Sequence, residues 1–300
     1  MDTSTVCTKK LLLIINPVSG KRAVIRFIPH ILRRFMDAGY LVTAMVTSRR
    51  GEATELARRY AGGHDLVVCT GGDGTLNETL SGLAAEDIQV PLGYIPCGST
   101  NDFAVSRHLP TDILTAAERI ASGEIRRYDI GRFGRHYFSY VAAFGAFSWL
   151  SYTTDQNLKN VLGHTAYILD GIKDLPRVRP LHLKLTADGI VHEDDYIFGA
   201  VANSTSIAGT IQLPESFVDT ADGRFEVLLI RNPKTLVEFE ETVRGLLTQD
   251  YSVPQLELFH AQEILAESES PLEWTVDGEF PGLYDKVHIT PIPGFLQLQS

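Results

Sequence analysis

Three short segments rich in glycine and hydroxyl side chains each follow an apolar run in the first hundred residues. The segments are residues 16–22, 71–78 and 96–104, and the apolar runs are residues 11–15, 65–69 and 92–95. Glycine lets a backbone approach a bound group closely, and a helix that begins at such a turn presents free N–H donors. These donors suit anions, phosphate above all. A single turn of this kind could also be a tight strand–helix connection without a ligand.

The elements around these segments should bring the three turns to one edge of a sheet. Strands expected at residues 10–16, 40–47, 65–70 and 91–95 alternate with helices at 22–37, 52–61 and 75–84, followed by helical pieces near 101–107 and 112–122. This alternation is typical of a parallel, doubly wound α/β sheet. The turns after parallel strands emerge at their carboxyl ends, where ligands bind. The three turns together therefore favour a binding edge.

The character of the chain changes after Gly123. Strands are expected at residues 127–130, 137–141, 182–186, 191–203, 225–230, 255–260, 273–276 and 286–291, with helical pieces near 155–173 and 234–247. The Asp188-Gly189 pair between two of these runs is a hairpin signal. We therefore predict a second half that is mostly antiparallel β-structure, as a sandwich or open barrel.

The composition is that of an ordinary globular protein. Charged residues make up 21% and hydrophobic residues 44% of the 300 residues. No apolar run approaches the roughly 20 residues that span a bilayer, and the first residues lack the order of a signal peptide. Cys7, Cys69 and Cys97 are odd in number and lack metal-ligand spacing, which predicts reduced thiols and a cytoplasmic protein. The net charge of −10 argues against nucleic-acid binding.

Basic residues are concentrated near the beginning of the chain. Residues 1–60 contain 11 Lys and Arg against 4 Asp and Glu, a surplus of +7, and many of them stand in pairs such as Lys21-Arg22. Such pairs could attract nucleotide phosphates or an anionic membrane surface. They could equally be solvated helix faces. Both interpretations stay open from the sequence.

The glycine-rich segments resemble the diacylglycerol kinase catalytic family, which includes the sphingosine and ceramide kinases and the bacterial diacylglycerol kinase-like lipid kinases. The family's Asn-Pro-x-Ser-Gly, Gly-Gly-Asp-Gly-Thr-x-Asn-Glu and Pro-x-Gly-Thr-x-Asn-Asp-Phe-Ala patterns match residues 16–20, 71–78 and 96–104. Ser99 stands where threonine is common. A fourth signature, Val-Asp-Gly-Glu, matches residues 276–279. The order and spacing fit nearly the whole chain.

This resemblance implies an ATP- and Mg²⁺-dependent kinase that phosphorylates the hydroxyl of diacylglycerol or a similar lipid alcohol, at the inner membrane face. It implies a nucleotide-binding domain over residues 1–125 and a lipid-acceptor domain over 126–282, with the active site in the cleft between them. Residues 283–300 would return to the first domain. A homodimer and the individual lipid stay open.

The resemblance also assigns roles to individual residues. Backbone amides in the first two turns would donate to the phosphates, Asp73 would hold Mg²⁺ or its water shell, and Thr47 and Ser99 match nucleotide-contacting positions. Asp73 could instead cap the next helix. The expected nucleotide-binding residues are Asn16, Pro17, Ser19, Gly20, Thr47, Gly71, Gly72, Asp73, Gly74, Thr75, Asn77, Glu78, Ser99 and Asn101.

Two carboxylates near the C-terminus could supply the base. Asp277 and Glu279 flank Gly278, so in a strand both side chains would face the same way. Paired carboxylates raise the pKa of one partner, which suits it to accept a proton. The alternative is a charged turn. The resemblance favours Glu279 as the base with Asp277 as its partner, and it places Asp102 in the active site, where an N-cap is the alternative.

Further expectations concern a second metal and the acceptor. Related bacterial lipid kinases hold a structural Mg²⁺ at a position that maps to Asp222 and the carbonyls of Asp219 and Arg224, although a plain Asp-Gly turn is a rival. Phe138, Phe144, Phe147 and Trp149 could line an acyl pocket or simply fill a β-core. Two other functions remain as alternatives: an NAD kinase-like enzyme with a soluble acceptor, and a nucleotide-binding regulator without turnover.

Overall fold

The computed structural model describes residues 8–99, 101–145, 179–207 and 211–300. The chain forms two compact units. Unit 1 comprises Met1–Ile130, Tyr137–Ser139 and Ile292–Ser300, and unit 2 comprises Gly131–His136 and Tyr140–Pro291. The sequence placed the boundaries at residues 125 and 282. Cys7, the helix expected near 155–173, and Phe147 and Trp149 lie outside the described residues.

Unit 1 is built on a parallel sheet. Its strands β1 (Lys9–Ile15), β2 (Tyr40–Val46), β3 (Leu66–Gly71) and β4 (Leu92–Pro96) lie in the order β4-β3-β1-β2, and all neighbours run parallel. Near the end of β15 (Leu283–Gln299), Leu298 pairs with Leu92 in parallel. The inner strands β3 and β4 are buried throughout, as their unbroken apolar runs require. The predicted parallel sheet is confirmed.

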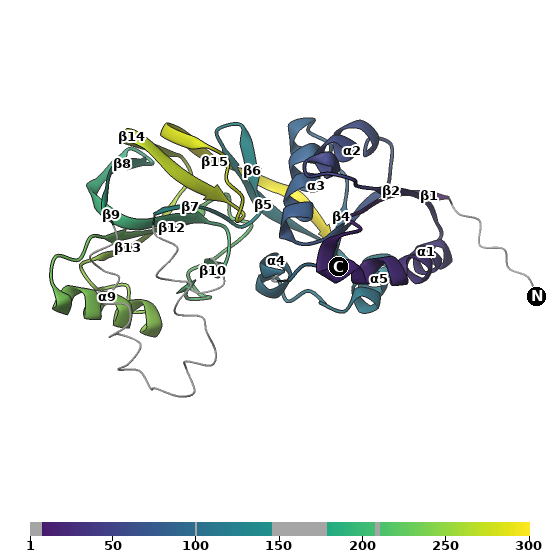
Figure 1. Cartoon of the computed structure of the whole chain (residues 1–300), viewed down its shortest axis with the longest axis horizontal. Helices are drawn as coiled ribbons and strands as arrows, with labels where there is room; N and C mark the ends of the chain where they lie inside the picture. The colour runs from purple at the N-terminus through teal and green to yellow at the C-terminus, as the bar shows by residue number, and fades with distance from the viewer. Residues whose placement is uncertain (1–7, 100, 146–178, 208–210) are drawn as a thin grey trace, which may run out of the picture. The chain divides into compact units, whose positions relative to one another are not determined.

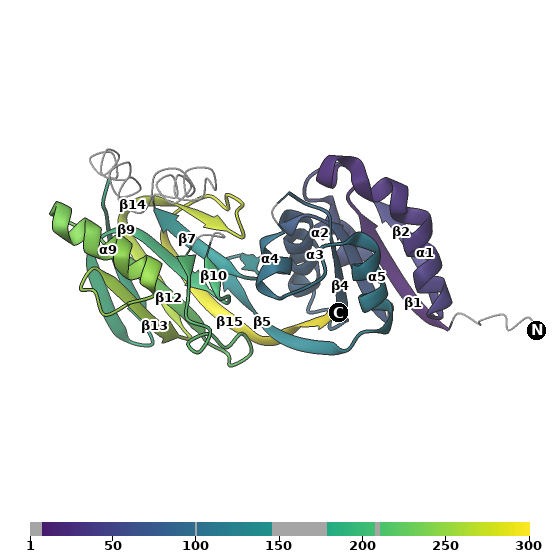
Figure 2. The same ribbon diagram turned by 90° about the horizontal axis from the view of Figure 1, so that it is seen from below.

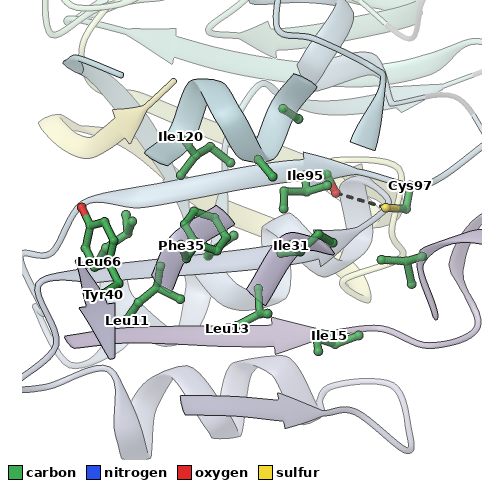
Figure 3. Packing of buried hydrophobic residues seen from close by; sticks show 14 residues of the cluster. Leu11, Leu13, Ile15, Ile31, Phe35, Tyr40, Leu66, Ile95, Cys97 and Ile120 are labelled. Carbon is green, nitrogen blue, oxygen red and sulfur yellow. Dashed lines mark hydrogen bonds between the residues drawn. The ribbon is translucent and has the colours of Figure 1, made fainter. Parts of the chain in front are cut away.

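Helices cover both faces of this sheet (Figures 1 and 2). Helices α2 (Glu52–Tyr60) and α3 (Asp73–Ala85) pack together on one face, and α1 (Ile28–Asp37) and α5 (Ile113–Ser122) pack together on the other. Figure 3 shows the core between the sheet and α1 and α5, which is formed by Leu11, Leu13, Ile15, Ile31, Phe35, Tyr40, Leu66, Ile95, Cys97 and Ile120. This packing fixes where each strand ends and so where each turn begins.

The two described cysteines are free and buried, and Cys97 belongs to this core. Burial raises the pKa of the Cys69 thiol to about 12. Burial likewise raises the pKa of the Cys97 thiol to about 11. Both thiols therefore stay protonated at neutral pH and act as small apolar groups.

The helix expected over residues 22–37 is in fact two segments. Ser19–Phe27 forms the 3₁₀ segment η1, and the α-helix α1 begins only at Ile28. Pro29 explains the break, because proline lacks an N–H and its ring clashes with the carbonyl four residues earlier. In the first turn of α1 this N–H has no intrahelical partner to lose, so proline is tolerated there.

Unit 2 is an antiparallel structure, as predicted. Its described strands are β6 (His136–Phe138, shared with unit 1), β7 (Val141–Gly145), β8 (Leu181–Ala187), β9 (Ile190–Ala202), β12 (Phe225–Arg231), β13 (Leu256–Ala261) and β14 (Ile264–Val276), with β5 (Ile125–Phe133) and β15 contributing from their ends. They run in the order β13-β12-β9-β7-β14-β15, and β8 pairs with both β9 and β14. Short strands β10 (Ser206–Ile207) and β11 (Ile211–Gln212) form a separate ribbon, and α9 (Leu236–Thr248) contacts β11.

The strand expected at residues 273–276 is much longer than predicted. Strand β14 begins at Ile264 and pairs with β15 through a register shift between Glu267 and Leu272. The serine- and glutamate-rich stretch around this irregularity, which includes Pro271, hides the alternating pattern.

Among the described helices, none has the length and apolar character that crossing a membrane requires.

Candidate active site

Glycine contacts join the three glycine-rich turns of unit 1. We call residues 16–22 the first turn, residues 71–78 the second turn and residues 96–104 the third turn. Gly20 has φ +52°, and a Cβ there would overlap the carbonyl oxygen of Cys97. A Cβ on Gly98 would lie 2.7 Å from the Cα of Gly72. The amide of Cys97 donates to the carbonyl of Gly71 at 2.6 Å. The first turn therefore touches the third and the third touches the second, at distances that only glycine allows.

Asn16 and Thr75 connect the first turn to α3. The Asn16 Nδ2 donates to Thr75 Oγ1 at 2.9 Å, and Asn16 Oδ1 accepts from the amide of Val18 at 3.2 Å. Thr75 is buried, and a Cβ on Gly71 would overlap its side chain. The pair therefore holds the first turn against the beginning of the helix.

Helix α3 begins in the middle of the second turn. Gly72 is its extended N-cap, with φ −90° and ψ −175°, and Asp73 is its first residue. The helix is 13 residues long, so a full macrodipole ends at this turn. Gly74 and Thr75 lie in the first turn of this helix. The amide of Thr75 donates to the carbonyl of Gly72 at 2.9 Å, and the other backbone N–H groups at the start of a helix are donors that suit an anion.

Asp73 bridges the second and third turns. Its carboxylate accepts hydrogen bonds from the amides of Asp102 and Phe103 at 3.0 and 3.2 Å, and these residues begin the short helix α4 (Asp102–Ser106). The anticipated cap exists, but Asp73 caps α4 and not the helix that it begins. This bridge holds the two turns in a fixed arrangement.

The two acidic side chains at this bridge both have a raised pKa, mainly because they are partly buried. Burial raises the pKa of Asp73, although the hydrogen bonds from Asp102 and Phe103 oppose the rise. Burial, and then the charge of Asp73, raise the pKa of Asp102. Two partly buried carboxylates that repel each other beside helix amides are a fitting place for a divalent cation, because Mg²⁺ needs only one or two carboxylates alongside water and phosphate oxygens.

Asn101 closes the third turn on itself. It adopts the left-handed conformation at φ +54°, its Oδ1 accepts from the amide of Gly98 at 2.8 Å, and its Nδ2 donates to the carbonyl of Gly98 at 3.1 Å. Ser99, between them, is exposed. The side chain of Asn101 therefore holds the third turn in shape, and the side chain of Ser99 is exposed.

Other predicted nucleotide-binding residues hold the surrounding elements. Glu78 accepts from the amides of Gly51 and Ala53 at 2.7 and 3.3 Å and so caps α2. Asn77 Nδ2 donates to the carbonyl of Tyr137 at 2.9 Å, and Thr47 is buried after β2. The observed contacts are structural, and direct nucleotide contact by these three side chains stays a prediction. Pro17 and Ser19 lie on either side of the exposed Val18 in the first turn.

Asp277 and Glu279 do not lie side by side on a strand, so that sequence inference is wrong. Val276 and Glu279 exchange two backbone hydrogen bonds of 2.8 and 2.9 Å around a two-residue turn. Asp277 and Gly278 occupy this turn with φ of +47° and +80°. Asp-Gly is the pair that such a turn favours, because both positions need positive φ.

The two carboxylates therefore have different surroundings. Asp277 is 3% exposed, and its Oδ1 accepts from the amides of Tyr140 and Val141 at 3.1 and 3.0 Å. Glu279 is partly exposed at the end of the turn. Asp277 thus fixes the turn to β7 and Glu279 is presented by it.

The Asp222 region forms two local turns. The amide of Arg224 donates to Asp222 Oδ1 at 2.9 Å, and the amide of Ala221 donates to Asp219 Oδ1 at 3.1 Å. Both aspartates are exposed. The anticipated Asp-Gly turn is present, and the structural Mg²⁺ stays a prediction.

Sequence reasoning missed Gly98 and Tyr94 as parts of this site. Gly98 provides the contact to Gly72, and hydrogen bonding by the Tyr94 hydroxyl lowers the pKa of Asp73 against the effect of burial. The position of Gly98 in the glycine-rich turn after β4 was the available signal. Tyr94 lies inside this strand, where the sequence carries no signal for such a role.

The paired arginines are mostly engaged with nearby carboxylates. The ion pairs are Arg33–Asp37, Arg34–Glu118, Arg49–Glu55 and Arg58–Glu86. All are exposed, so each contributes little to stability. For these four arginines the solvated helix face is the favoured interpretation.

Comparison with known proteins agrees with this architecture. Residues 10–133 match the family described as the diacylglycerol kinase catalytic domain, and residues 148–300 match the family described as the YegS C-terminal NAD kinase beta sandwich-like domain. A diacylglycerol kinase of Staphylococcus saprophyticus is 33% identical over 91% of this chain and 90% of its own length. The diacylglycerol kinase of Bacillus subtilis is 32% identical over 94% and 96%.

A solved structure has the same fold. The crystal structure of a diacylglycerol kinase from Bacillus anthracis covers 97% of this chain and 96% of its own, with a TM-score of 0.75 at 23% identity. The diacylglycerol kinases of Staphylococcus saprophyticus and Bacillus subtilis share about one third of their residues with this chain over about nine tenths of both sequences. This is well above the identity that a shared fold alone would give. The chain therefore belongs to the diacylglycerol kinase family and is a kinase.

Proposed function

We propose that this kinase transfers the γ-phosphoryl group of ATP, with Mg²⁺, to the hydroxyl of diacylglycerol or a similar lipid alcohol at a membrane surface. The observation that carries the proposal is the junction of the three glycine turns at the N-terminus of α3. The relatives named diacylglycerol kinase support the choice of acceptor.

The turns account for the nucleotide side of the reaction. Phosphoryl transfer depends on positioning and on stabilising the charge of the phosphates, with little covalent chemistry for the protein to perform. Amides of the first turn of α3 and of the Ser19-Gly20 backbone would donate to phosphate oxygens. The contacts between the turns would keep these donors in place before the nucleotide arrives, which avoids reorganisation during the reaction.

Asp73 and Asp102 would hold the magnesium ion or its water shell. When bound, Mg²⁺ neutralises charge that develops on the transferred phosphoryl group. Burial, and then the charge of Asp73, raise the pKa of Asp102, and a cation held by these residues would favour the charged form of both carboxylates. Asp73 also keeps α4 in place, so it serves structure and metal at once.

Glu279 would accept the proton of the acceptor hydroxyl. It is partly exposed at the end of a rigid turn, whereas Asp277 is buried and occupied by two backbone amides. We therefore assign Asp277 as the positioning residue and Glu279 as the base. This keeps the assignment that the family resemblance favoured, with Glu279 as the base and Asp277 as its partner.

Incubation with labelled ATP and a panel of acceptors tests the proposal. The panel contains a diacylglycerol, a long-chain amino alcohol such as sphingosine, and NAD as a soluble acceptor. We expect label in diacylglycerol or a related lipid alcohol, and only with Mg²⁺. Label in NAD alone would establish the soluble-acceptor alternative, and nucleotide binding without any labelled product would establish a regulator.

A further inference from the structure

Two large apolar side chains are exposed directly after the proposed base. Phe280 is 57% and Leu283 is 61% exposed, while the neighbouring Trp274 and Val276 are 1% and 4% exposed. Only Pro281 and Gly282 separate the two exposed residues. We call residues 277–283 the tip; it joins β14 to β15.

Strand pairing and aromatic packing support the tip at its base. Glu273 of β14 pairs with Leu283 of β15, and Leu272 pairs with Tyr284. The ring of Trp274 lies 5.0 Å from that of Phe133 and 4.9 Å from that of Phe144, measured between centroids. The aromatic interior next to the tip therefore consists of these packed rings, and Phe280 and Leu283 lie outside it.

The charge around the tip limits what can cover it. Residues 273–285 contain Glu273, Asp277, Glu279 and Asp285 but no lysine or arginine. Such a segment gains nothing from an anionic surface and is repelled by one. An uncharged lipid surface is the partner that fits, because its acyl region accepts the phenyl and isobutyl groups while its hydrated headgroups leave the carboxylates in contact with water.

We propose that Phe280 and Leu283 insert into the boundary between headgroups and acyl chains of a lipid surface, and so carry Glu279 to the acceptor hydroxyl. The inference rests on the proposed function. An uncharged lipid alcohol keeps its hydroxyl at that boundary, because its chains stay in the hydrocarbon. A base that meets it there needs apolar neighbours that remain favourable at that depth.

A second hairpin in the same unit provides a matched control. Asp188 and Gly189 connect β8 and β9 with φ of +48° and +85°, nearly the values of Asp277 and Gly278. Ile190 and Val191 after this turn are 66% and 52% exposed. The control therefore removes the same number of exposed apolar side chains beside the same type of turn.

The test measures binding of the full chain to phosphatidylcholine vesicles with and without diacylglycerol, in the absence of ATP. The variants are Phe280→Ser/Leu283→Ser and Ile190→Ser/Val191→Ser. Burial of one large apolar side chain is worth roughly tenfold or more in partitioning. We expect the first variant to lose at least about tenfold of vesicle binding and the control to stay close to wild type. Thermal unfolding should be unchanged in both, since all four side chains are exposed.

The outcomes separate this inference from the proposed function. Unchanged vesicle binding by Phe280→Ser/Leu283→Ser overturns the inference, and so does an equal loss in both variants, which would indicate unspecific adhesion. Replacing part of the phosphatidylcholine with an anionic lipid should not restore binding to the first variant; restoration overturns the inference. If the tip directs vesicle binding but labelled ATP yields no phosphorylated lipid, the proposed function fails while the lipid-binding tip stands.

Discussion

At the scale of single residues, the polar side chains of this site are mostly acceptors for backbone amides. Asp73, Glu78 and Asp277 each accept two N–H groups from another part of the chain, and Asn101 accepts one from its own turn. Removing such an acceptor leaves a buried donor unsatisfied, which costs about 1–3 kcal/mol. Loss of activity alone therefore does not identify a catalytic role, and each substitution needs a structural control.

We expect Glu279→Gln to lower turnover by about 10²–10⁴-fold, because it keeps the size of the side chain but removes the proton acceptor. ATP affinity should barely change, since the amides proposed to bind the phosphates belong to unit 1. Steady-state rates and equilibrium ATP binding provide the measurement. Glu273→Gln makes the same change at an exposed position of the same hairpin and should retain full turnover. Near wild-type turnover in Glu279→Gln would transfer the role of base to Asp102 or Asp277.

Asp73→Asn should impair both stability and magnesium dependence. The carboxylate uses both oxygens to accept from α4, whereas an amide keeps one acceptor oxygen, so we expect a loss of about 1–3 kcal/mol in the free energy of unfolding. The magnesium concentration for half-maximal activity should rise. Asp112→Ala is the control, because it removes the side chain that accepts from the amide of Thr115 at the start of α5 in the same unit. It should lose stability without any shift in the magnesium titration; an equal shift in both variants would remove Asp73 from the metal site.

At the scale of elements, the site depends on strand–helix turns that touch through glycine. Gly20→Ala should separate the first turn from the third, because its Cβ would overlap the carbonyl of Cys97 in addition to the strain of positive φ. Gly39→Ala is the control: it has φ +86°, and among the described residues no heavy atom lies within 4 Å of its ideal Cβ. The control should lose only the roughly 1–2 kcal/mol of left-handed strain.

Denaturant unfolding and ATP binding distinguish the two glycine variants. Gly20→Ala should lose more stability than Gly39→Ala and should bind ATP much more weakly, whereas Gly39→Ala should keep wild-type affinity. Equal ATP affinity in the two variants would mean that the contact between the turns is not needed for nucleotide binding. The same element-scale reasoning applies to Glu78, which ties the beginning of α2 to α3 and so fixes where the second turn stands.

At the scale of the whole molecule, nucleotide and acceptor roles are assigned to different units. Saturating ATP at about a hundred times its dissociation constant should stabilise its binding unit by about 2.7 kcal/mol. Hydrogen exchange with mass spectrometry should therefore slow in residues 16–20, 71–78 and 96–104. Exchange in β12 and β13, which lie in unit 2, should stay unchanged. Protection confined to unit 2 would contradict the assignment.

The sequence by itself determined the alternation of strands and helices, the parallel direction of the strands in unit 1 and the mostly antiparallel direction of those in unit 2. These features depend on local periodicity and on turn residues, which are readable one segment at a time. The glycine turns and their family resemblance were equally readable. The Asp-Gly turn at Asp277 also carried a local signal, and a charged turn was the alternative to a strand there.

Only the tertiary structure decided which group each side chain meets. The amides that donate to Asp73 lie 29 and 30 residues away in the sequence, and those that donate to Asp277 lie 137 and 136 residues away. Nothing in the local sequence encodes such a partner, because it appears only when strands and helices have packed. Packing therefore made Asp73 a bridge between two turns and Asp277 an anchor for the turn, and left Glu279 as the carboxylate presented at its end.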